Sequence, residues 1–147
     1  MALRYIFATV VYAVIDIGWN VTPVARGMYE RLHEASGNDW SFGKSPDTWG
    51  GVEVAGLVVF LLLIGLGNSY LAIEPAIRER KLSRAVKNSL VLGCAAYATY
   101  IVPTHLAIAN WPGILIPIDI LIGGLLSVIT STVVTSISLR RLSGQPR

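Results

Sequence analysis

The fold class of this chain is decided by one uncharged stretch of eleven residues, Leu57-Val58-Val59-Phe60-Leu61-Leu62-Leu63-Ile64-Gly65-Leu66-Gly67. It lies inside a longer apolar segment, 51–73, and a helix of about 20 apolar residues is long enough to cross a bilayer. Three further apolar segments occur at 3–20, 86–109 and 114–139. The sequence therefore predicts an all-α fold, an integral membrane four-helix bundle that forms a single transmembrane domain over residues 1–147.

The composition agrees with a membrane protein and argues against several other classes. Hydrophobic residues make up 53% of the chain and charged residues only 14%, whereas soluble domains carry about 25% charged residues. The net charge is +3, and the basic residues lie beside apolar segments, so we expect no nucleic-acid partner. Cys94 is the one cysteine, which excludes an intrachain disulfide. No Cys/His pattern suggests a zinc or haem site, and we predict no cofactor and no metal.

The basic residues also predict the orientation of the chain in the membrane. They crowd the link between spans two and three, whereas the link at 105–113 has no Lys or Arg. Because loops rich in Lys and Arg stay in the cytoplasm, both termini and the middle link are expected to be cytoplasmic in a multi-pass protein of the cell inner membrane. The first segment is interpreted as an uncleaved span, because Asp16 lies in it and no cleavage signal follows.

A short amphipathic helix is predicted between spans one and two. Thr22 and Pro23 are typical of a helix N-cap and first position. Four apolar side chains then fall on one face, Val24, Met28, Tyr29 and Leu32. This helix is expected to lie on the membrane surface or to extend span one. Three aromatic residues follow it, Trp40, Phe42 and Trp49; they are interpreted as interface anchors, with a substrate lid as the alternative.

Small residues recur along span four at intervals of four, namely Gly123, Ser127, Ser131 and Thr135. Such a stripe lets helices approach closely in lipid, so these residues are predicted to mediate helix packing. The pattern does not say which helix meets the stripe. Membrane lipids are expected partners, and assembly into a homo-oligomer or a larger membrane protein complex stays open.

Two acids, Asp16 and Asp119, interrupt apolar spans and are the main clue to function. A carboxyl group inside a bilayer is costly and marks a functional hypothesis by default. The helical rise places Asp119 about 12 Å below Trp111, so both acids are expected in the outer half of the membrane. Other polar or aromatic residues are predicted at the same level as candidate ligand-binding residues: Trp19, Glu53, Tyr97, Tyr100, Thr104 and His105.

Three explanations of the acids compete. The carboxyl groups can tie helices together through hydrogen bonds to Tyr, Thr or backbone groups. They can instead line an outward-facing acidic cavity that binds or translocates a small or lipid-like molecule. They can also act, with His105, as acid and base on a lipid-borne substrate. Among activities, we expect binding or translocation first, an accessory or structural subunit of a larger membrane assembly second, and a membrane enzyme third, with no catalytic residue assigned.

The chain resembles a family of small bacterial four-span inner-membrane proteins known only as a domain of unknown function. In chain order, the resemblance rests on Ile15-Asp16-Ile17-Gly18-Trp19, the segment 23–29, Gly56-Leu57-Val58-Val59-Phe60, Glu74-Pro75-Ala76-Ile77, Tyr97-Ala98-Thr99-Tyr100, Asn110-Trp111-Pro112 and Asp119. Family members typically have the polar stretch Asp-Leu-Thr-Asn directly after the tyrosine that corresponds to Tyr100. This chain has Ile101-Val102-Pro103-Thr104 there. The resemblance implies the fold and the membrane location, and it implies no reaction.

Overall fold

The computed structural model of the protein describes residues 2–35, 37, 48–107 and 110–143, with the side chain of His33 left aside. All the secondary-structure elements assigned in these ranges are helices, which confirms the predicted all-α fold. The aromatic residues Trp40 and Phe42 lie outside the described residues. Four helices are long and apolar enough to cross a membrane, Ala2–Asn20, Gly51–Glu79, Leu82–Ala107 and Leu115–Ser143.

The elements follow one another as α1 (Ala2–Asn20), α2 (Pro23–Ala35), α3 (Gly51–Gly67), the π-helical turn η2 (Asn68–Ile73), α4 (Glu74–Glu79), α5 (Leu82–Ala107) and α6 (Leu115–Ser143). The elements α3, η2 and α4 form one continuous helix. The predicted short helix between the first two spans is α2. Its cap is also as predicted, because the Thr22 hydroxyl accepts the Ala25 N–H at 3.1 Å.

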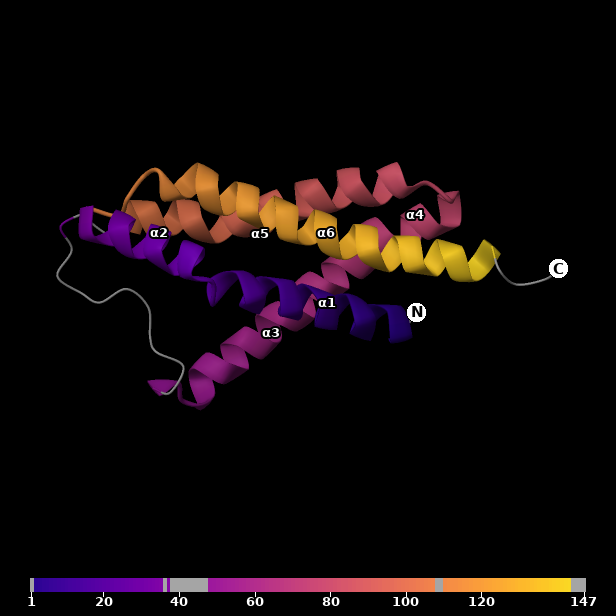
Figure 1. The fold of residues 1–147 in the computed structure, drawn as a ribbon, viewed down its shortest axis with the longest axis horizontal. Helices are drawn as coiled ribbons and strands as arrows, with labels where there is room; N and C mark the ends of the chain where they lie inside the picture. The colour runs from indigo at the N-terminus through magenta and orange to yellow at the C-terminus, as the bar shows by residue number, and fades with distance from the viewer. Residues whose placement is uncertain (1, 36, 38–47, 108–109, 144–147) are drawn as a thin grey trace.

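The helices form a bundle that is tight along α5 and α6 and open at the start of α3 (Figure 1). The α5–α6 pair shares the largest interface, while α1 packs against both α3 and α6. In Figure 1 the first half of α3 diverges from the other helices. The start of α1, the corner between α4 and α5, and the end of α6 lie at one end of the molecule, and α2 lies at the other. The start of α1 and the end of α6 are therefore on the same side.

Glycines allow the closest helix contacts. A Cβ atom on Gly93 of α5 would lie 2.2 Å from the carbonyl oxygen of Gly123 in α6, and one on Gly65 of α3 would lie 2.1 Å from Thr9 Oγ1 in α1. Only a residue without a side chain fits at such contacts. The small residues thus determine where the helices cross, as the packing mode of membrane helices requires.

The helix α3–η2–α4 contains a proline that leaves a backbone carbonyl free. Pro75 has no N–H to donate, so one backbone carbonyl in the turn before it lacks a helical donor. The side-chain amide of Asn88 in α5 donates to the carbonyl of Leu71 in this turn at 2.5 Å. A free carbonyl in hydrocarbon is costly, and neighbouring helices usually satisfy it. Asn88 therefore joins α5 to the η2–α4 region.

Candidate functional site

Asp119 is buried near the start of α6 and receives two tyrosine hydroxyls. It is 3% exposed. Tyr29 of α2 donates to Oδ1 at 2.5 Å, and Tyr100 of α5 donates to Oδ2 at 2.8 Å. One carboxyl group therefore connects α2 to the consecutive helices α5 and α6.

Asp16 is buried near the end of α1 and takes part in a similar arrangement. It is 7% exposed. Tyr97 of α5 donates to Asp16 Oδ1 at 3.1 Å, and Tyr12, one turn before Asp16, donates to the Tyr97 hydroxyl at 3.5 Å. Among the described residues, no hydrogen bond reaches Asp16 Oδ2, so this oxygen is available to accept from a bound molecule.

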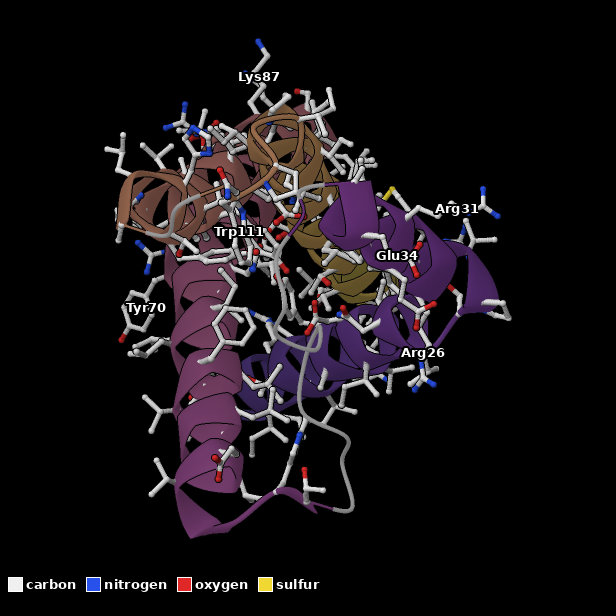
Figure 2. All side chains as sticks on the ribbon, turned by 90° about the vertical axis from the view of Figure 1, so that its left-hand side faces the viewer. Arg26, Arg31, Glu34, Tyr70, Lys87 and Trp111 are labelled. Atoms are coloured by element: carbon white, nitrogen blue, oxygen red, sulfur yellow. The ribbon has the colours of Figure 1, made fainter. Side chains whose placement is uncertain are left out.

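The two arrangements adjoin through the rings of Tyr97 and Tyr100, whose centroids are 5.7 Å apart in an edge-to-face contact. We call this group the Asp–Tyr cluster; its members are Asp16, Asp119, Tyr12, Tyr29, Tyr97 and Tyr100. Within the described ranges, no Lys or Arg forms an ion pair with either acid. Figure 2 views this end of the molecule and shows Arg26 and Arg31 of α2 pointing outward. The cluster is therefore acidic and rich in hydroxyl groups, and neither acid pairs with a cationic side chain of the described residues.

Tyr29 is the cluster residue that lies outside the membrane-spanning helices. Burial raises the pKa of its hydroxyl above the ordinary value, and the hydrogen bond to Asp119 and the charge of Asp119 raise it further. The ordinary pKa of tyrosine is about 10, so Tyr29 keeps its proton at neutral pH. It acts as a stable donor that holds α2 against α6.

The structure does not bring every predicted residue into the cluster. Glu53 lies at the start of α3, where its Oε2 accepts the N–H of Gly50 at 3.0 Å. Thr104 donates to the carbonyl of Tyr100 at 2.7 Å. His105 Nδ1 lies 3.2 Å from the carbonyl oxygen of Trp111 and connects the end of α5 to the following link. Trp19 lies beside Tyr29 at the border of the cluster.

A second group of buried polar residues lies deeper in the bundle, around Asn68 at the start of η2. Ser131 donates to Asn68 Oδ1 at 2.8 Å, and the Asn68 amide donates to Ser127 Oγ at 3.5 Å and to the carbonyl of Ile64 at 3.0 Å. Three further buried hydroxyls have no hydrogen-bond partner within the described part of the chain, those of Ser69, Thr130 and Thr135. We call the six polar residues the Asn68 group; its members are Asn68, Ser69, Ser127, Thr130, Ser131 and Thr135.

The small residues of α6 therefore meet other helices of the same chain. A Cβ atom on Gly123 would lie 2.2 Å from the Tyr97 ring, and Ser127 and Ser131 face Asn68. Thr135 is fully buried. The stripe is thus occupied by α5 and η2, which sequence spacing alone could not specify.

Sequence reasoning did not assign Tyr12, Tyr29 or Asn68 to a site. Tyr12 precedes Asp16 by four residues, so it lies on the same helix face. Tyr29 belongs to the apolar face of an amphipathic helix, where the sequence does not distinguish it from an aromatic residue at the membrane interface. Asn68 is an amide directly after an apolar run, and that isolation is a usable signal, because a lone polar group within a span needs a partner. In the described residues, no three His, Cys, Asp or Glu side chains gather as a metal site.

The fold and the buried polar clusters define an integral membrane protein with four candidate spans. More particularly, the chain belongs to the family of predicted membrane proteins DUF2177, which matches residues 1–136. The matched region covers all six residues of the Asp–Tyr cluster. No curated protein and no solved structure shows a significant match to the chain.

Proposed function

We propose that this protein binds a small or lipid-like molecule at the Asp–Tyr cluster and translocates it from the outer side of the cell inner membrane. The observation that supports this proposal is the pair of buried acids, which have no cationic partner in the part of the chain that the structure describes. A membrane interior disfavours charged groups unless they pair or serve a function. A bound molecule with a cationic or hydroxyl group supplies the partner that Asp16 lacks. Neighbouring tyrosine hydroxyls add donors and acceptors for its polar atoms.

The Asn68 group supports translocation as well as binding. Asp119, Ser127, Ser131 and Thr135 all lie on α6 at intervals of four or eight residues and are all buried. The helical rise gives this polar face a length of about 24 Å, most of a hydrocarbon core about 30 Å thick. Hydroxyls without partners can interact with a passing polar group. The face therefore offers successive polar contacts along the membrane normal.

The experiment compares the molecules that co-purify with the wild type, Asp16→Asn and Asp119→Asn. Each protein is extracted in mild detergent, and its bound small molecules and lipids are identified by mass spectrometry. The proposal expects a species bound to the wild type that is depleted at least tenfold in both variants. Glu30→Gln is the matched control, because it makes the same chemical change at an exposed position of α2 and should retain the species. Uptake of that species into liposomes containing the protein then tests translocation.

A purely structural role makes a different prediction. If the acids only hold the helices together, Asp119→Asn will lower the midpoint of thermal unfolding. The wild type and Asp119→Asn will then co-purify with the same molecules in the same amounts. That result would overturn the proposal. Accumulation of a chemically altered lipid that depends on Asp16 would indicate an enzyme instead.

An accessory subunit of a larger assembly is the second candidate, and the first half of α3 favours it. This part of α3 diverges from the bundle (Figure 1), and three of its apolar side chains are well exposed, Val52, Val54 and Val58. Such a face fits another membrane helix as well as it fits lipid. Stable co-purification with a larger protein, lost when Val54 and Val58 are replaced by Trp, would support this candidate.

A further inference from the structure

A pocket lies at the opposite end of the molecule from the Asp–Tyr cluster. It has a volume of about 460 Å³ and lies between the first turns of α1 and the last turns of α6. Its lining consists of Leu3, Arg4, Phe7, Ile137, Ser138, Arg141 and Leu142. Arg4 is separated from Asp16 by about 18 Å of helix. The pocket is therefore a separate feature from the proposed ligand site.

The pocket combines two guanidinium groups with apolar walls. Arg4 Nη1 donates to Glu74 Oε1 at 2.9 Å, which holds this side chain in place and leaves its other N–H groups available. Arg141 is exposed and forms no ion pair within the described residues. Arginine is well suited to phosphate, because its planar fork of N–H groups matches the phosphate oxygens. The pocket thus fits an anion with an oxygen-rich head.

The apolar walls indicate that this anion carries hydrocarbon. Leu3 is 72% exposed, and Phe7 and Leu142 are also exposed. These side chains continue into the exposed apolar surface of α1, where Ile6 and Val10 follow. A free phosphate ion would contact the arginines and leave this surface unused, whereas a lipid would cover it with its acyl chains.

The charge at this end of the molecule favours an acidic lipid in particular. Basic residues gather on the adjoining α4–α5 corner and at the end of α6, namely Arg78, Arg80, Lys81, Arg84, Lys87 and Arg140. The acids described at this end, Glu74 and Glu79, are both in ion pairs. Clusters of Lys and Arg at a membrane surface attract anionic lipids, and basic pockets between helices bind their head groups.

We propose that this pocket binds the phosphate and glycerol of an anionic phospholipid. Arg4 and Arg141 contact the phosphate, and the acyl chains lie along Leu3, Phe7 and Leu142. The site does not depend on the proposed translocation activity.

The test uses the full chain purified in detergent, with bound lipid counted by native mass spectrometry. Phosphatidylglycerol, phosphatidylcholine and inorganic phosphate are the three probes. We expect phosphatidylglycerol to bind at least fivefold more tightly than phosphatidylcholine, and inorganic phosphate to leave thermal stability unchanged. Arg141→Gln should weaken phosphatidylglycerol binding about tenfold, the effect of losing a charged hydrogen bond of ordinary strength.

The matched control is Arg31→Gln, which removes the same charge from α2 at the other end of the molecule (Figure 2) and should leave binding unchanged. Arg4→Gln leaves Glu74 without its partner and can impair folding, so Arg141→Gln is the deciding variant. The proposal would be overturned if Arg141→Gln bound phosphatidylglycerol as tightly as the wild type does, or if the wild type bound the two lipids with equal affinity. It would also be overturned if inorganic phosphate raised the thermal stability of the protein as much as phosphatidylglycerol does.

Discussion

At the scale of single residues, the two buried acids are distinguished by the donors that surround them. Among the described residues, Asp119 accepts from two tyrosine hydroxyls, one on each of its oxygens, whereas the Asp16 carboxyl group accepts from one. Asp119 is thus the better-satisfied group, and Asp16 has the greater capacity to take a new partner. Under the proposed function, Asp16 makes the first contact with the bound molecule, and Asp119 keeps α2 and α5 attached to α6.

Tyr29→Phe tests whether the contact with Asp119 holds α2 in place, and it should destabilise the folded protein by about 1.5–3 kcal/mol, the contribution of a hydrogen bond to a carboxylate. Because the pKa of Tyr29 is raised in the folded state, its contribution is fully present below pH of about 10 and is lost as the pH rises above that value. The difference between wild type and variant should therefore shrink in alkaline solution. Unfolding in detergent at several pH values measures it.

Tyr70→Phe is the control for this measurement. Tyr70 is 61% exposed, and Figure 2 shows it pointing away from the bundle. Its replacement should leave stability unchanged at every pH. An equal loss in both variants would mean that the Tyr29–Asp119 contact contributes nothing specific.

At the scale of elements, the crossing of α5 and α6 depends on the absence of side chains. Gly93→Ala would place a methyl group 2.2 Å from a backbone oxygen and 2.7 Å from Ser127 Oγ, so the two helices must separate. Overpacking of this kind costs about 1–3 kcal/mol, and we expect that loss in a chemical unfolding experiment. Gly56→Ala is the control, because nothing lies within 4 Å of its added Cβ. Comparable destabilisation by both substitutions would contradict the packing argument.

The contact of Asn88 with the region around Pro75 provides a second test at this scale. Asn88→Leu should cost about 1 kcal/mol, because it removes the side-chain donor to the Leu71 carbonyl. In a Pro75→Ala background the backbone N–H of residue 75 can supply that donor, so the same substitution should cost less. A double-mutant cycle measures the coupling. Additive effects would show that Asn88 acts independently of the proline.

At the scale of the whole molecule, the start of α1, the end of α6 and the α4–α5 corner lie at one end (Figure 1). The orientation predicted from the sequence puts the basic residues at this end in the cytoplasm, and the placement of both sites depends on that prediction. In that predicted orientation, the Asp–Tyr cluster is expected toward the outer surface and the proposed lipid pocket in the cytoplasmic leaflet. The molecule is thus polarised along the membrane normal, with its acidic and basic features at opposite ends.

Cysteine labelling tests this arrangement in intact cells. In a Cys94→Ser background, single cysteines at Ser83 and Ser143 should react with an impermeant reagent only after the membrane is opened. A cysteine at Glu30 of α2 should react in closed cells. The inverse pattern would reverse the orientation, and opposite behaviour of positions 83 and 143 would contradict the fold itself.

The sequence alone determined the class, the four apolar helices, the amphipathic helix with its Thr22 cap, and the unusual position of Asp16 and Asp119. These properties follow from hydropathy, local capping and helical rise, which depend only on neighbours along the chain. Only the tertiary structure decided that Tyr29 and Tyr100 meet Asp119, that Glu53 lies apart on the diverging start of α3, and that Asn68 occupies the small-residue stripe of α6. The physical reason is that helix partners and rotations depend on close contacts such as Gly93 with Gly123, and these join residues far apart in sequence through packing in three dimensions.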